Sequence, residues 1–168
     1  MTAHAIKLWG GMVIFVAVGL VGAHASFSSP LLLPEGLFYV LLLVHTYLSI
    51  DLFSRIETRT FDQVAIDVLL CASYIGLGLS MGTSLTFFFA NVCLFVAAPL
   101  KYAFLLEKIP YAALLRRKIL VDLSGTVLAV GTLGIALMGY PVFAAWTQAV
   151  LFGLASVRYL ITHPLYRV

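Results

Sequence analysis

Six long apolar runs follow one another along the chain, separated by short segments that contain charged, proline or glycine residues. Each run is about 17–24 residues long, and a helix of that length crosses the roughly 30 Å hydrocarbon core of a bilayer. The pattern predicts membrane-spanning helices at 7–23, 36–53, 62–82, 84–106, 118–138 and 142–161. We therefore expect an all-α polytopic integral membrane protein, in which residues 1–168 form one domain, a bundle of six transmembrane helices.

The composition excludes a water-soluble domain. Hydrophobic residues make up 62% of the chain and charged residues 10%, and the mean hydropathy is +1.08. An average soluble domain has about 45–50% apolar and about 25% charged residues. The isoelectric point near 9.0 does not predict a nucleic-acid partner, because the basic residues stand between apolar runs and form no basic face with interleaved aromatics. Membrane lipids are the expected partners, and a second copy or another membrane protein remains open.

The positions of lysine and arginine predict the orientation. Half of them lie in the segment 101–122, and short loops rich in these residues stay on the cytoplasmic side of a membrane. With six spans, this rule places all ten on the same side as both termini: Lys7, Arg55, Arg59, Lys101, Lys108, Arg116, Arg117, Lys118, Arg158 and Arg167. The connections at 24–34, 82–84 and 139–141 hold none. The sequence therefore predicts an N-in/C-in topology, and the small loops favour a bacterial inner membrane.

Small residues and one proline predict local backbone features. Small side chains at helical spacing favour close helix contacts, and they occur at Gly78 with Gly82 and at Gly125 with Ala129. Pro99 has no amide hydrogen, so we expect it to free the carbonyl of the residue four positions before it, Phe95.

The most informative residues are ionisable groups within the apolar runs, where water does not solvate them. All of them are predicted at one level, about one turn from the cytoplasmic ends of their helices: Asp51, Asp67, Lys101, Asp122 and Arg158. In a structural interpretation, acids near helix N-termini and bases near C-termini complement the helix dipole, and Asp–Lys and Asp–Arg pairs hold the helices together. In a functional interpretation, the same residues line a polar chamber open to the cytoplasm. Asp67 and Asp122 are then proton- or cation-responsive groups, with Lys101 and Arg158 as counter-charges.

Two further polar residues are predicted deeper in the membrane. Asn91 is expected to hydrogen-bond between helices, as intramembrane amides commonly do. His45 lies near the middle of its run, and a buried, hydrogen-bonded role is favoured over haem ligation, because the other histidines fall near or beyond the membrane edge. We include both residues in a predicted polar pathway with the five charged residues.

Enzymatic and metal-binding motifs are absent from the sequence. The chain has no HExxH, CxxC, G-x-S-x-G or P-loop pattern, so no cofactor or metal is expected and an enzyme is not favoured. The leading hypothesis is a small transporter or channel, or a subunit of one, for a small solute or ion. The alternatives are a non-catalytic membrane subunit that assembles with larger partners and a membrane-embedded enzyme acting on lipid headgroups.

Overall fold

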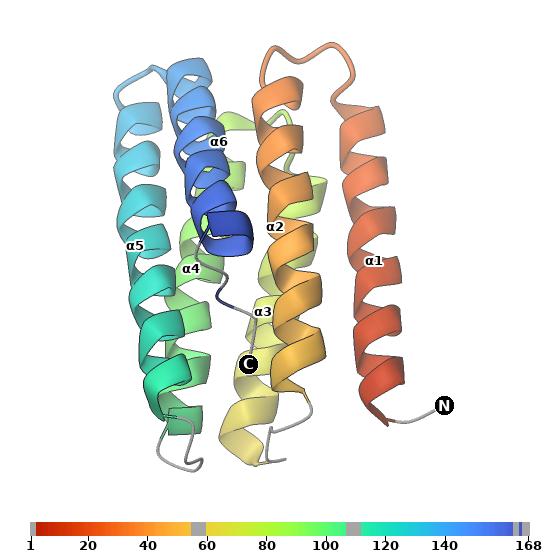
Figure 1. Cartoon of the computed structure of the whole chain (residues 1–168). Coiled ribbons are helices and arrows are strands. Elements are labelled where there is room, and N and C mark those ends of the chain that lie inside the picture. The colour runs from red at the N-terminus through yellow and green to blue at the C-terminus, as the bar shows by residue number, and fades with distance from the viewer. Residues whose placement is uncertain (1–2, 55–59, 107–111, 163–164, 166–168) are drawn as a thin grey trace.

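The protein is an all-helical bundle of six long helices (Figure 1). The computed structural model describes residues 3–54, 60–106, 112–162 and 165. The helices are α1 (Ala3–Ala25), α2 (Leu32–Phe53), α3 (Phe61–Leu79), α4 (Ser84–Leu106), α5 (Ala112–Leu137) and α6 (Pro141–Val157), and a π-helical turn, η1 (Arg158–Thr162), continues α6. All six are long and apolar enough to span a bilayer. The predicted six-helix membrane bundle is therefore confirmed.

Some helix boundaries differ from the predicted ones for identifiable reasons. The third helix ends at Leu79, three residues early, because Gly82 lies in the following turn with a positive φ of 79°. The second begins at Leu32 and takes in Pro34 and Glu35, since proline is tolerated in the first turn of a helix, where its missing amide hydrogen has no helical partner. The fifth begins at Ala112, so Arg116 and Arg117 are also helical.

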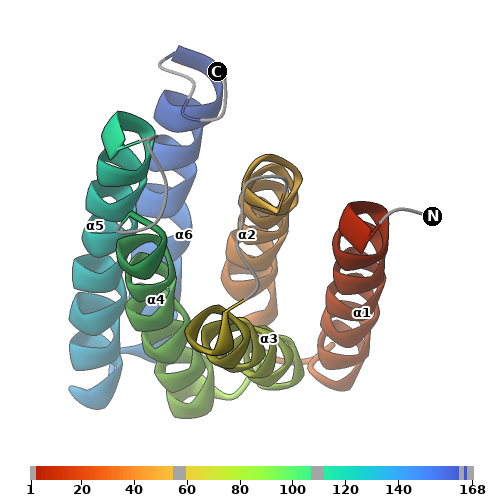
Figure 2. The same cartoon turned by 90° about the horizontal axis from the view of Figure 1, so that it is seen from below.

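The helices are arranged as a ring. The main contacts run in the order α1–α3–α4–α5–α6–α2 and back to α1, with a few further contacts between α4 and α6. Figure 2 shows this order from below, with α2 between α6 and α1. Large apolar side chains such as Val13, Val127 and Leu154 stand exposed on the outside of the helices. An apolar outer surface on six potential spans indicates contact with membrane lipid, and we describe the chain as an integral membrane protein.

The alternating helix directions give the bundle two distinct ends. We call the end where α1, α3 and α5 begin the basic end, because the described lysines of α1, α4 and α5 lie in that half. The opposite, far end holds the connections 26–31, 80–83 and 138–140, at the top of Figure 1. Arg55, Arg59, Lys108 and Arg167 lie outside the described residues. Which compartment the basic end faces remains a prediction.

A very close helix contact joins α1 to α3. A Cβ atom added to Gly22 would lie 1.8 Å from the carbonyl oxygen of Gly78, and one added to Gly78 would lie 2.7 Å from a methyl carbon of Val18. On α5, a Cβ at Gly125 would lie 2.4 Å from the ring of Phe95. The close packing predicted at Gly78 and Gly125 is thus confirmed, whereas Gly82 lies in the turn after α3 and not within the helix.

Candidate functional site

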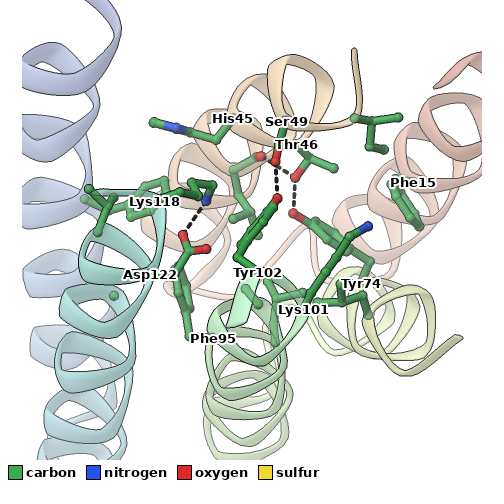
Figure 3. Close-up of a pocket in the computed structure, with 18 of the residues that line it drawn as sticks. Phe15, His45, Thr46, Ser49, Tyr74, Phe95, Lys101, Tyr102, Lys118 and Asp122 are labelled. Carbon is green, nitrogen blue, oxygen red and sulfur yellow. Dashed lines mark hydrogen bonds and ion pairs between the residues drawn. The ribbon is translucent and has the colours of Figure 1, made fainter. Parts of the chain in front are cut away.

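A partly open pocket occupies the centre of the ring in its basic half (Figure 3). Its cavity volume is about 210 Å³, and residues from all six helices line it. On α1 the lining extends from Lys7 to Phe15, which corresponds to about 12 Å along the helix axis. The pocket therefore reaches from the basic end to about the middle of a bilayer-sized bundle.

The first charged group of the pocket joins three helices through Asp67. One carboxylate oxygen of Asp67 accepts from Lys101 Nζ at 2.6 Å, and the other accepts from Lys7 Nζ at 2.6 Å. Lys101 is almost buried, with 10% of its side chain exposed. The side chains of Lys7 and Asp67 are 36% and 27% exposed. The sequence placed Asp67 and Lys101 at one level, and the structure brings them into direct contact. Lys7, which comes from α1, was not expected here.

The second charged group lies on α5. Lys118 donates to Asp122 Oδ1 one helical turn further on, and the two side chains are only 9% and 7% exposed. Lys118 Nζ also lies 5.0 Å from the centroid of the Tyr102 ring, within the range of a cation–π contact. The other carboxylate oxygen, Asp122 Oδ2, is buried and has no hydrogen-bond partner among the described residues.

Side chains with hydroxyl groups lie between the two charged groups of the pocket. Tyr102 shares a hydrogen bond with Ser49, and Tyr74 shares one with Thr46. Figure 3 shows Lys118 and Asp122 on one wall, Lys101 and Tyr74 on the other, and Tyr102 between them. The basic half of the pocket is thus polar on several sides.

The deeper wall of the pocket is largely apolar and aromatic. Phe15 stacks on Tyr74 with ring centroids 4.5 Å apart, and Phe95 and Phe152 meet with centroids 5.9 Å apart. His45 lies beside this wall: its Nε2 is 2.9 Å from Ser156 Oγ, and its ring contacts Phe152. This is the hydrogen-bonded role that the sequence favoured for His45.

The proline in α4 acts as predicted on the backbone. Pro99 leaves the carbonyl of Phe95 without its usual helical donor, and Thr126 Oγ1 of α5 donates to that oxygen at 2.6 Å. The carbonyl oxygen of Phe95 is therefore bonded to the neighbouring helix α5 rather than to a donor of its own helix. This bond joins α4 to α5 beside the aromatic wall of the pocket.

Three of the predicted site residues do not line the pocket. Arg158 is exposed at the start of η1, and the cation paired with Asp122 is Lys118 instead, because a spacing of four residues puts both on one face of α5. Asp51 is half-buried on α2 outside the lining. Asn91 is fully buried on α4, further towards the far end.

Sequence reasoning also missed Glu35. It is 1% exposed near the far end of α2, where its Oε2 accepts from the backbone N–H of Gly82 at 2.6 Å. It lies one residue before the predicted helix 36–53. No cluster of three or more histidine, cysteine or acidic side chains that would hold a metal occurs in the described part of the chain.

Cys71 provides a test of access to the pocket. It lines the pocket, whereas Cys93 of α4 is exposed elsewhere, and neither forms a disulfide. In sealed vesicles, we expect an anionic, membrane-impermeant methanethiosulfonate reagent to modify Cys71 in a Cys93→Ser variant from one side only. Intact-protein mass spectrometry measures the modification. The matched Cys71→Ser variant, which retains Cys93, should stay unmodified, and the reverse pattern would show that water does not reach the pocket.

Comparison with models of known protein families, with curated proteins and with solved structures finds no match for this chain. A pocket with charged and hydroxyl groups near one end and aromatic walls deeper in is suited to binding a small molecule that has both a polar and an apolar part.

Proposed function

We propose that the chain is a small membrane transporter, or the solute-binding subunit of one, that takes a small organic anion into the central pocket from the basic end. The observation that carries this proposal is the pocket itself, which every helix of the ring lines. Ion pairs that served only to hold helices together would pack without a cavity between them. A cavity bordered by both pairs is better explained as a binding site.

The size and walls of the pocket favour an organic solute over a bare ion. A volume of about 210 Å³ is large for one ion and small beside the roughly 300–1,000 Å³ of sites for drug-sized ligands. The aromatic wall formed by Phe15, Phe95 and Phe152 offers apolar contact to one part of a solute. The lysines near the basic end offer charge to the other part.

The charged lining favours a negative group on that solute. Among the described lining residues, three are lysines and two are aspartates. Asp67 contacts two of the lysines at 2.6 Å. This wall of the pocket therefore carries two positive charges and one negative charge. In this proposal the carboxylates position the lysine amino groups, and the lysines bind the anionic end of the solute.

We place the basic end on the cytoplasmic side of a bacterial inner membrane. This placement is supported by the positions of lysine and arginine, which cluster at one end of the predicted spans. In membrane proteins, such residues in short loops stay on the cytoplasmic side. The solute then enters the pocket from the cytoplasm.

Uptake into liposomes tests the proposal. The purified full chain in sealed liposomes is expected to take up benzenesulfonate, a permanently charged aromatic anion, faster than protein-free liposomes, and not to take up phenyltrimethylammonium. A Lys7→Gln variant keeps the Asp67–Lys101 pair, and its initial rate should fall about threefold, the size of effect typical of a charge at the rim of a site. Filtration and chromatographic quantification of the probe measure the rate.

A non-catalytic membrane subunit is the second candidate, and one observation favours it. Both carboxylates are in direct contact with lysines, and Asp67 links α1, α3 and α4. If the pairs serve assembly alone, the wild-type protein will take up neither probe. That result would overturn the transport proposal.

A further inference from the structure

Three helices repeat one arrangement of a polar and an aromatic residue. Glu35 lies three residues before Phe38 on α2, Asn91 four before Phe95 on α4, and Gln148 four before Phe152 on α6. Residues three or four apart share a helix face. Because α2, α4 and α6 all run from the far end to the basic end, each polar residue lies on the far side of its phenylalanine.

The three phenylalanines form one aromatic layer. Phe38 lies 4.9 Å from Phe152 and 6.3 Å from Phe95, and Phe95 lies 5.9 Å from Phe152, all between ring centroids. Phe95 and Phe152 line the pocket, and Phe38 is packed behind them, 1% exposed. The aromatic layer therefore closes the pocket on its far side.

The polar residues beyond the aromatic layer are buried and incompletely hydrogen-bonded. Glu35, Asn91 and Gln148 are 1%, 0% and 1% exposed. Across the described residues, neither polar atom of the Asn91 side chain has a partner, and Glu35 Oε1 and Gln148 Nε2 also have none. The other two side-chain oxygens are bonded: Thr132 Oγ1 donates to Gln148 Oε1 at 3.0 Å, and the N–H of Gly82 donates to Glu35 Oε2 at 2.6 Å. Unpaired polar atoms inside a bundle are costly to maintain, so a purely structural role explains them poorly.

We propose that Glu35, Asn91 and Gln148 form a second polar site, through which the solute passes to the far end when the aromatic layer opens. This inference rests on the proposed transport function. The site offers the amide N–H groups of Asn91 and Gln148 as donors and the free oxygen of Glu35 as an acceptor. The amide donors therefore suit the negative group of the same small organic anion, and the free oxygen of Glu35 suits a water molecule that accompanies it.

The position of Glu35 gives this site a connection to the far end. Its other oxygen accepts from the N–H of Gly82 in the connection 80–83, and Ser29 of the connection 26–31 donates to the carbonyl of Gly82. The second polar site is thus bounded by the aromatic layer on one side and by the far-end connections on the other. The aromatic layer separates the pocket from that end.

Apolar replacement of the amides tests the inference. Asn91→Leu and Gln148→Met remove the unpaired polar atoms and keep a side chain of similar shape, so the melting temperature in detergent should stay the same or rise. Benzenesulfonate uptake should fall about five- to tenfold, the loss of roughly one hydrogen bond to the passing solute. Binding of benzenesulfonate to the pocket, measured as a shift in melting temperature, should be unchanged. Thr147→Val, at the half-buried neighbour of Gln148, is the matched control and should leave all three quantities unchanged.

The possible results are distinguishable. If the wild-type protein takes up no benzenesulfonate, the transport proposal fails and this inference fails with it. If the wild type takes up the probe and both amide variants do so at the wild-type rate, only the second polar site is overturned. A melting temperature lowered in both variants would also overturn it, because it would assign the amides a structural role.

Discussion

Replacing Gly22 with alanine is expected to lower the free energy of unfolding by about 3 kcal/mol, at the upper end of the usual cost of overpacking. The added methyl group would lie 1.8 Å from the carbonyl oxygen and 2.9 Å from the carbonyl carbon of Gly78. Both atoms belong to the backbone of α3, so no side-chain rotation relieves the overlap and the two helices must separate. Alanine gains about 1 kcal/mol in helix propensity over glycine, which is too little to offset this cost.

The same substitution should weaken the pocket. Separation of α1 from α3 moves Lys7 and Phe15 away from Asp67 and Tyr74, which they contact directly. Unfolding of the detergent-solubilised protein, followed by circular dichroism, measures the loss of stability. Gly10→Ala on the same helix is the matched control, because a Cβ there meets nothing within 4 Å. Equal stability of the two variants would contradict the close α1–α3 contact.

The helices were predictable because their cause is local. A run of apolar residues long enough to cross the hydrocarbon is visible in the sequence itself, and six such runs became six helices. The shared level of Asp67 and Lys101 followed from the same reasoning, since opposite helix directions bring residues near corresponding ends together. The effect of Pro99 was equally predictable, because its missing amide hydrogen identifies which carbonyl loses its helical donor without knowledge of the fold.

The lateral arrangement of the helices was not predictable from these patterns. Depth in the membrane does not say which helices are neighbours, so the contact of Lys7 with Asp67 across α1 and α3 had no sequence signal. For Asp122 the depth rule suggested Arg158, although Lys118 was available four residues away on the same helix. That local spacing would have been the better guide. Glu35 was overlooked because α2 begins before Pro34 rather than after it.

The Lys118–Asp122 pair should show the largest effect of any single charge change. Lys118→Met removes the hydrogen-bond donor of Asp122 and leaves a carboxylate, 7% exposed, without a hydrogen bond in the described part of the protein. Breaking one side of a buried ion pair costs about 3–5 kcal/mol, because the remaining charge has neither water nor a partner. Unfolding in detergent, measured as for the glycine variants, should show this loss.

A double variant separates the structural from the functional role of the pair. Lys118→Met with Asp122→Leu replaces both charges by apolar side chains, and such replacements are neutral or stabilising in many buried pairs. The double variant should therefore regain most of the stability that Lys118→Met alone loses. If Lys118 binds the anionic end of the solute, benzenesulfonate uptake stays low in the double variant despite the recovered stability. Recovery of both stability and uptake would show that the pair serves the packing of α5 alone, since only a binding role requires the charge itself.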